Sequence, residues 1–206
     1  MDYERKREEM VEHLHNRERL GPETEAAMRA VPRHEFVPET QRDAAYRDTP
    51  LPIGEGQTIS APHMVAVMVE RLDLSPGDRV LEIGTGCGYH AAVTAEVVGA
   101  ENVYSVEYHE QLAKSARETL ERTGYGDISV RVGDGREGWP EQAPYDRAYL
   151  TCAASSFPDA LVEQVPDGIL LGPIGNGSQI LVRAHTSDGS VESRERHGHV
   201  RFVPLK

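Results

Sequence analysis

The sequence has little cysteine and no long hydrophobic segment, and both features narrow the kinds of protein it can encode. Its 206 residues contain two cysteines, Cys87 and Cys152, without the spacing of metal ligands. They predict neither a disulfide framework nor a metal site, and we interpret both as small buried side chains. No apolar run approaches the roughly 20 residues that span a bilayer, and the charged first ten residues do not resemble a secretory signal. We therefore expect a cytoplasmic protein that does not bind a membrane.

Basic charge is also scarce. Lysine and arginine total 22 against 34 aspartates and glutamates, which gives a net charge of −12. This balance argues against binding a nucleic acid backbone, which requires a basic face, but it allows a peptide partner. The length suits one domain over residues 1–206, and we expect a monomer. Its expected parts are an N-terminal helical region (1–50), a cofactor-binding α/β core (51–182) and a C-terminal strand pair (183–206).

The distribution of apolar, proline and glycine residues predicts the order of elements. Helices are expected within residues 1–35, the second from Pro22 to before Pro32, whereas residues 38–58 are rich in proline and glycine and should be largely irregular. Ser60 is expected to cap a helix with Pro62 in its first turn. Strands are expected at 79–83, 103–107, 128–132, 146–151 and 169–174, helices at 89–98, 110–123 and 158–165, and closing strands at 179–185 and 197–203 around a turn at 187–189.

This alternation of strands and helices predicts an open, mostly parallel sheet with helices on both faces. The last two strands have no helix between them, so we expect an antiparallel strand there. Ligands of such sheets bind at the carboxyl ends of the strands. The glycine-rich loop that follows the first predicted strand of the sheet, at 84–88, should therefore face a ligand.

The glycines of this loop indicate the kind of ligand. Gly84, Gly86 and Gly88 follow Glu82 in a GxGxG pattern, and glycine lets a ligand approach the backbone closely. The dinucleotide pattern GxGxxG would need glycine at position 89, which is Tyr89. The loop has no lysine, which excludes a phosphate-binding loop of ATPases. The pattern therefore favours S-adenosylmethionine over a pyrophosphate cofactor.

Three further segments carry candidate binding residues. Glu107 ends the next predicted strand, where a carboxylate can accept hydrogen bonds from ribose hydroxyls. Asp134 and Gly135 follow the third strand and could meet an adenine amino group, although an ordinary turn has the same residues. Around Ser60, the helix cap is the simpler interpretation, and His63 alone is best read as a hydrogen-bonded partner.

Several of these segments together resemble protein-L-isoaspartate O-methyltransferases. The stretch Gln57-Thr58-Ile59-Ser60-Ala61-Pro62-His63-Met64 is similar to a specific signature of that family. Other similar stretches follow in the same order along nearly the whole chain: Ala30-Val31-Pro32-Arg33, Phe36-Val37-Pro38, Val80-Leu81-Glu82-Ile83-Gly84-Thr85-Gly86, Gly133-Asp134-Gly135, Gly138-Trp139-Pro140, Ala143-Pro144-Tyr145-Asp146 and Phe202-Val203-Pro204-Leu205.

The resemblance implies an α/β fold of the Rossmann-like class I S-adenosylmethionine-dependent methyltransferases, with a mostly parallel central sheet, a C-terminal antiparallel strand and N-terminal helices. It implies methylation of the free carboxyl of L-isoaspartyl residues in damaged proteins, which initiates repair and leaves S-adenosylhomocysteine. Ser60 matches the active-site serine. The residues expected to bind the cofactor are Thr58, Ile59, His63, Glu82, Gly84, Thr85, Gly86, Glu107, Tyr108, Asp134 and Gly135, with no metal.

A carboxylate with a reference pKa of about 4 is ionised at neutral pH, so methyl transfer to it needs alignment rather than a general base. Ser60 is expected to position the substrate and not to attack it. The stretch Cys152-Ala153-Ala154-Ser155 departs from the family pattern near the expected substrate cleft, as do Asp167-Gly168 and Leu171-Gly172-Pro173-Ile174. Two alternatives therefore remain, namely a methyltransferase for another peptide carboxylate, or a catalytically weak relative that binds the cofactor or a damaged peptide.

Overall fold

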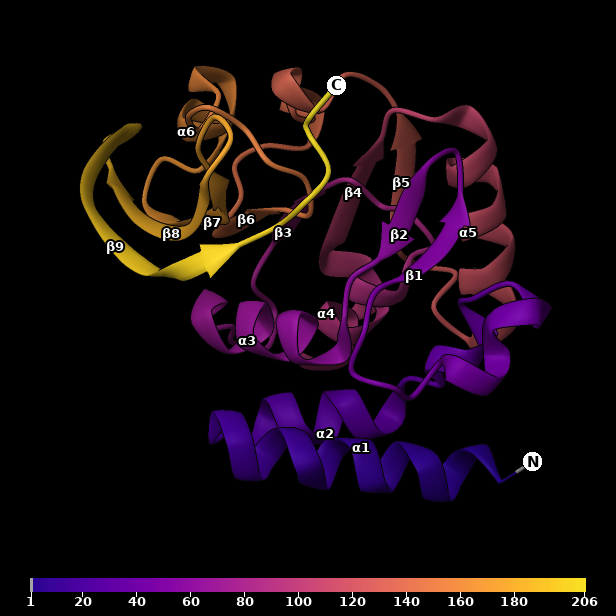
Figure 1. Cartoon of the computed structure of the whole chain (residues 1–206). Helices are drawn as coiled ribbons and strands as arrows, with labels where there is room; N and C mark the ends of the chain where they lie inside the picture. Colours follow the sequence, from indigo (N-terminus) through magenta and orange to yellow (C-terminus); the bar gives the residue numbers. More distant parts are fainter. Residues whose placement is uncertain (1) are drawn as a thin grey trace.

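A seven-stranded sheet forms the centre of the computed structural model, which describes residues 2–206 (Figure 1). Its strands lie in the order β5-β4-β3-β6-β7-β8-β9, and the first five are parallel. β8 pairs antiparallel with both β7 and β9. This arrangement confirms the predicted mostly parallel sheet. The bounds are β3 (Val80–Ile83), β4 (Val103–Glu107), β5 (Ser129–Val132), β6 (Arg147–Leu150), β7 (Gly168–Ile174), β8 (Gln179–Ser187) and β9 (Ser190–Val200).

Helices cover both faces of the sheet, but unequally. α3 (Pro62–Leu72), α4 (Tyr89–Val98) and α5 (Glu110–Thr123) share one face, and α1 (Tyr3–Glu18) and α2 (Pro22–Ala30) form a further layer against α3 and α4 (Figure 1). The other face holds the short α6 (Asp159–Gln164) and the chain around Trp139 and Tyr145. The alternation of buried residues along β3 serves both cores, since Val80 packs with the helical layers and Leu81 with the α6 side.

The order of strands fixes where a ligand can enter. From β3 the chain proceeds outward through β4 to β5, and it then returns to the other side of β3 with β6 and β7. A crevice forms at the carboxyl ends of the strands where such connections change direction. In this sheet that point lies between β3 and β6, so the segments that follow these two strands border the crevice.

The prediction of irregular structure for residues 38–58 is wrong for its last part. β1 (Leu51–Gly54) and β2 (Gln57–Ile59) form an antiparallel hairpin, and short 3₁₀ turns occupy Arg33–Glu35 and Glu39–Ala44. Gly54, Glu55 and Gly56 all have positive φ angles of 101°, 51° and 70°. The glycines that suggested a break in order therefore supply the turn of a hairpin.

The predicted role of Ser60 as a helix cap is also wrong. α3 begins at Pro62, its N-cap is Ala61, and the N-cap makes no side-chain hydrogen bond. Proline is favoured as the first residue of a helix because its missing N–H would have no partner there, and this preference places the N-cap one residue after the expected one. The Ser60 side chain is therefore not used by the helix.

The last strand is longer than the predicted one at 197–203. β9 begins at Ser190 because Asp188 and Gly189, with φ angles of 51° and 69°, form a two-residue turn directly after β8. Its exposed, charged residues at the sheet edge lack the apolar alternation of a half-buried strand. Residues 201–203 lie beyond the strand and lead into the C-terminal segment.

We expect Gly168→Ala to destabilise the fold by about 2 kcal/mol or more, because its Cβ would lie 2.0 Å from the main-chain oxygen of Asp146 and the strand must shift. Urea unfolding measures the effect. Gly126→Ala is the matched control: its Cβ meets only the end of the flexible Glu121 side chain, and its cost should stay within about 0.5 kcal/mol. Equal stabilities of the two variants would contradict the packing described for β7.

Candidate functional site

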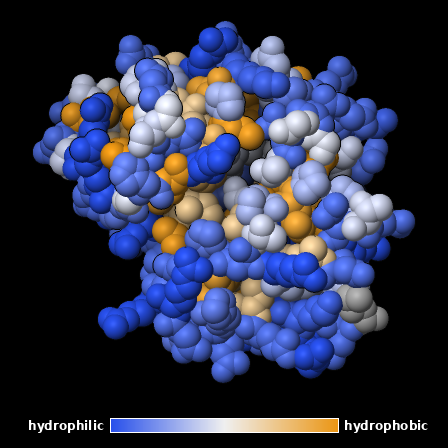
Figure 2. Space-filling model, in the orientation of Figure 1, coloured by the Kyte–Doolittle hydropathy of each residue, from blue (hydrophilic) through white to orange (hydrophobic). Residues whose placement is uncertain are grey.

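A pocket of about 780 Å³, including its open mouth, lies at the carboxyl ends of the central strands. In the space-filling view, hydrophilic residues cover most of the face, and hydrophobic residues gather around a hollow between the C-terminal segment and the β1–β2 hairpin (Figure 2). Segments from several parts of the chain line the pocket: residues 57–60 with Val65, residues 83–90 without Gly88, residues 106–109, Gly135, Thr151 with Cys152, and residues 203–206.

Most of the residues predicted from the sequence lie together in this pocket. They are Thr58, Ile59, Ser60, Gly84, Thr85, Gly86, Glu107, Tyr108 and Gly135. The other three predicted residues, His63, Glu82 and Asp134, are not among its lining residues. Two of these are engaged elsewhere: the Nδ1 atom of His63 lies 2.7 Å from the carboxylate of Asp48, and the carboxylate of Asp134 accepts hydrogen bonds from the side chain of Arg136.

Glu82 lies beneath the glycine loop and is fully buried. Its carboxyl group accepts hydrogen bonds from the hydroxyls of Ser105 on β4 and Tyr149 on β6. The hydroxyl of Ser105 also lies 2.6 Å from that of Thr85 in the loop, and Tyr149 lies 3.1 Å from the hydroxyl of Thr94 on α4. Burial raises the pKa of Glu82 to about 8, against the effect of these hydrogen bonds. Glu82 therefore stabilises the glycine loop indirectly, through the hydroxyl groups of Ser105 and Thr85.

Glu107, at the end of β4, presents its carboxylate to the pocket. One oxygen accepts a hydrogen bond from the main-chain N–H of Gly86 (2.8 Å) and the other from that of His109 (2.9 Å). The residue is 5% exposed. These two donors fix the orientation of the carboxylate relative to the loop, and each oxygen keeps further acceptor capacity. The arrangement can accept hydrogen bonds from a diol in the pocket.

Two glycines of the site have no room for a side chain. Gly84 has a φ angle of 97°, and a Cβ there would lie 2.3 Å from the hydroxyl oxygen of Thr151. That hydroxyl donates to the carbonyl groups of Ile83 and Gly84, which ties the end of β6 to the loop. A Cβ on Gly135 would lie 2.4 Å from the side chain of Ile83. Glycine is therefore required at both positions because neighbouring side chains, Thr151 and Ile83, pack directly against the main chain there.

Ser60 is held through its main chain. Its carbonyl accepts a hydrogen bond of 2.7 Å from Arg33, whose Nε donates to the carbonyl of Ala45 (2.8 Å). The Arg33 side chain is fully buried, and its guanidinium lies 4.8 Å above the ring centroid of Tyr89. Burial lowers the pKa of Arg33 from its ordinary value, although arginine stays protonated in proteins. The N-terminal region thus fixes the Ser60 segment against α4.

Several lining residues were not predicted from the sequence, among them His90, Thr151, Cys87 and the C-terminal segment, whereas Cys152 belongs to a stretch that was expected near the substrate cleft. Burial raises the pKa of the Cys87 thiol to about 11 and that of Cys152 to about 12. Both stay protonated at neutral pH, which supports their interpretation as packing residues. Of the stretch that departs from the family pattern, Cys152 lines the pocket whereas Ser155 is exposed and lies outside it.

The C-terminal segment closes one side of the pocket. The main-chain N–H of Ala153 donates to Val203 (2.7 Å), and that of Leu205 donates back to Ala153 (2.8 Å). These bonds hold residues 203–206 along the chain that follows β6. The family-like stretch ending at Leu205 was the one sequence signal for this wall.

Residues 2–206, the part of the chain that the structure describes, contain no cluster of three or more histidine, cysteine, aspartate or glutamate side chains that could hold a metal ion. Among the same residues, no helix has the length and apolar character needed to cross a membrane.

Comparison with known proteins gives consistent results. The family model described as protein-L-isoaspartate(D-aspartate) O-methyltransferase matches residues 5–206. Protein-L-isoaspartate O-methyltransferase 2 of Archaeoglobus fulgidus is 51% identical and aligns over 100% of this chain and 95% of its own length. The protein-L-isoaspartate O-methyltransferase of Methanopyrus kandleri is 49% identical and aligns over 98% of this chain and 92% of its own.

Solved structures agree with this likeness. One protein-L-isoaspartate O-methyltransferase has a TM-score of 0.88 at 29% identity, and the match covers 97% of this chain and 66% of that longer chain. A second, from Plasmodium falciparum and crystallised with S-adenosyl-L-homocysteine, has a TM-score of 0.86 at 27% identity, with 97% and 98% covered.

The buried carboxyl of Glu82 predicts a pH effect on stability. Because its pKa is raised to about 8, the folded protein keeps a proton between roughly pH 5 and pH 8 that the unfolded chain releases. The free energy of unfolding should therefore fall as the pH rises through this window. Glu82→Gln removes that contribution, and urea unfolding should show the variant gaining more than about 1 kcal/mol relative to the wild type between pH 5 and pH 8.

The exposed Glu118→Gln change on α5 is the control for this series. Its stability relative to the wild type should stay constant over the same pH range. A constant difference for Glu82→Gln as well would show that Glu82 does not keep its proton in the folded state.

Proposed function

The chain belongs to the protein-L-isoaspartate(D-aspartate) O-methyltransferase family, and we propose that the pocket carries out that chemistry through Glu107 and Ser60. The protein is an S-adenosylmethionine-dependent methyltransferase. It transfers a methyl group to the free carboxyl of L-isoaspartyl residues in damaged proteins, which initiates repair. The observation that carries the assignment of the site is that the glycine loop, Glu107 and the Ser60 segment line one pocket.

The residues present fit an adenosyl cofactor. Glu107, oriented by Gly86 and His109, would accept hydrogen bonds from both ribose hydroxyls. Gly135, which follows β5 next to β4, lies where the adenine would continue beyond the ribose. The backbone at Gly84 and Gly86 leaves space for the thioether side of the ligand. Thr58, Ile59, Thr85 and Tyr108 complete the lining, whereas His63, Glu82 and Asp134 would act indirectly.

The main contribution of the protein to this reaction is to align the substrate carboxylate with the methyl group. The cofactor supplies the methyl group, which a substrate carboxylate oxygen takes as the carbon–sulfur bond breaks and its electron pair stays on sulfur. Since the carboxylate is ionised at neutral pH, no side chain has to remove a proton from it. The chain holds the reactants in line and keeps water away from them with its buried walls.

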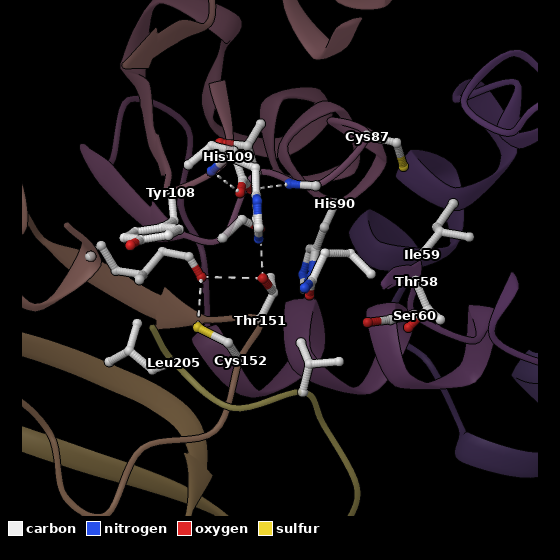
Figure 3. A pocket seen from close by; sticks show the side chains of 18 of the residues that line it. Thr58, Ile59, Ser60, Cys87, His90, Tyr108, His109, Thr151, Cys152 and Leu205 are labelled. Atoms are coloured by element: carbon white, nitrogen blue, oxygen red, sulfur yellow. Dashed lines mark hydrogen bonds between the residues drawn. The ribbon is translucent and has the colours of Figure 1, made fainter. Parts of the chain in front are cut away.

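Ser60 is suited to orient the substrate. Its hydroxyl is not used as a helix cap, its side chain lines the pocket, and its main chain is fixed by Arg33. A hydroxyl in this place would donate to the substrate carboxylate while the anchored carbonyl keeps the segment still. Cys152 lies across the pocket from Ser60 (Figure 3), so the stretch that begins with it would border the substrate peptide.

We also infer that residues 1–206 act as one methyltransferase domain and that the protein works as a cytoplasmic monomer on peptide substrates. The net charge of −12 supports a partner other than nucleic acid. An extended peptide could cross the pocket mouth beside the β1–β2 hairpin, held by main-chain hydrogen bonds that tolerate varied sequences.

The proposed activity predicts which of two matched peptides accepts a methyl group. Incubation with labelled S-adenosylmethionine should label a peptide with an isoaspartyl linkage and leave the aspartyl version unlabelled. Label on the aspartyl peptide would point to another carboxylate as the substrate, and binding without transfer would point to an inactive relative. Either result would contradict the proposal.

Ser60→Ala should lower kcat/KM for the isoaspartyl peptide by at least about tenfold, because a misaligned carboxylate reacts slowly. Steady-state kinetics with the labelled cofactor measure the loss. Ser115→Ala, an exposed change on α5, is the control and should keep full activity. Unchanged kinetics of Ser60→Ala would remove Ser60 from the mechanism.

Glu107→Gln should weaken the binding of S-adenosylhomocysteine by at least about tenfold, because the amide is uncharged and its NH₂ group would face the N–H of Gly86 or His109. Isothermal titration calorimetry measures the affinity, and the exposed Glu110→Gln change is the control. If both variants bind the ligand equally well, Glu107 does not hold the ribose.

A further inference from the structure

One buried side chain of the pocket has hydrogen-bonding atoms that the protein itself does not engage. His90 is 6% exposed, and neither of its ring nitrogens has a hydrogen-bond partner among residues 2–206. Burial lowers the pKa of His90 to about 3, so the ring is uncharged at neutral pH and has one N–H donor and one acceptor nitrogen. Buried polar atoms normally have partners, so an unengaged imidazole in a pocket wall indicates a contact with a ligand.

The order of the strands places this ring at one end of the pocket. His90 is the second residue of α4, and its ring centroid lies 4.5 Å from that of Tyr149 on β6. Glu107 ends β4, on the opposite side of β3. In the close view, the imidazole of His90 projects between Thr151 on one side and Ser60 on the other (Figure 3). His90 therefore lies at the β6 end, away from the carboxylate proposed to hold the ribose.

The amino-acid tail of the cofactor must extend toward this end. With the ribose at Glu107 and the adenine continuing toward Gly135 after β5, the sulfur and its tail have to cross the glycine loop in the opposite direction. The tail ends in a carboxylate. The N-terminus of α4, a helix of 10 residues, lies at the same place and adds a partial positive charge.

No arginine lines the described pocket, and its one lysine lies at the other end. The ammonium group of Lys206 is 3.2 Å from the Nε2 atom of His109, whose main-chain N–H donates to Glu107. The tail carboxylate therefore needs a different donor. We propose that the ring N–H of His90 donates a hydrogen bond to the carboxylate of the cofactor's amino-acid tail, together with the N-terminus of α4.

This inference rests on the proposed function, and two ligands test it separately from that function. S-Adenosylhomocysteine carries the amino-acid tail, whereas 5′-deoxy-5′-methylthioadenosine has the same adenosyl thioether without it. Isothermal titration calorimetry measures the affinity of the wild type and of two variants for each ligand. His90→Leu removes both ring nitrogens, and His90→Gln keeps a hydrogen-bond donor. His185→Leu on β8, outside the pocket lining, is the matched histidine control.

His90→Leu should bind S-adenosylhomocysteine at least about tenfold more weakly than the wild type, because it loses a hydrogen bond to a charged group. Its affinity for methylthioadenosine should stay within about twofold of the wild type. His90→Gln should recover part of the lost affinity, and His185→Leu should match the wild type for both ligands.

Three results would overturn the assignment of His90: an equal loss for both ligands, which indicates a deformed pocket, no loss for either, or a His90→Gln variant that binds as weakly as His90→Leu. A rise in the KM for the isoaspartyl peptide without a change in S-adenosylhomocysteine affinity would place His90 on the substrate instead and would also overturn it. If the wild type binds neither ligand, the proposed function fails, which is a different outcome from a failure of His90.

Discussion

The arrangement of the pocket depends on the hydrogen bonds of one buried group, the carboxyl group of Glu82. It joins the central strand β3 to both neighbours, through Ser105 on β4 and Tyr149 on β6. Thr85 in the glycine loop reaches the same network through Ser105, and Thr94 on α4 reaches it through Tyr149. Because β3 lies where the connections of the sheet change direction, these bonds fix the segments that form the pocket floor. Glu82, which the sequence placed among the cofactor-binding residues, is therefore buried behind the pocket lining.

The rest of the site is assembled on this floor from segments far apart in the sequence. Glu107 is fixed by two main-chain donors, and the Ser60 segment is fixed from the N-terminal region by the buried Arg33. The C-terminal residues around Leu205 close the side above β6. Methyl transfer to an ionised carboxylate requires distance and direction more than acid–base groups, and anchored main chain provides both. The protonated thiols and uncharged His90 in the walls agree with such a site.

The sequence predicted those parts of the site that depend on neighbouring residues along the chain, such as the glycine loop and the ends of the strands. The GxGxG loop after a strand and Glu107 at the end of the next were found because strand ends and glycines are visible in the sequence. The prediction of Ser60 as a helix cap was wrong because a serine before a helix can either cap the helix or face a pocket. The helix begins at Pro62, so its N-cap is Ala61 and the Ser60 side chain is left to the pocket. β9 was misplaced because an edge strand carries no apolar alternation. His90 could not be found, since only packing against β6 brings an α4 histidine into the pocket wall.

A crystal structure of the protein with S-adenosylhomocysteine is the most direct test of this account. It should show both ribose hydroxyls within hydrogen-bond distance of Glu107, the sulfur above the glycine loop on the side of Ser60, and the Glu82 network unchanged from the structure described here. A ribose bound away from Glu107, or a sulfur directed toward Gly135 instead of Ser60, would contradict the order of binding positions that the sheet predicts.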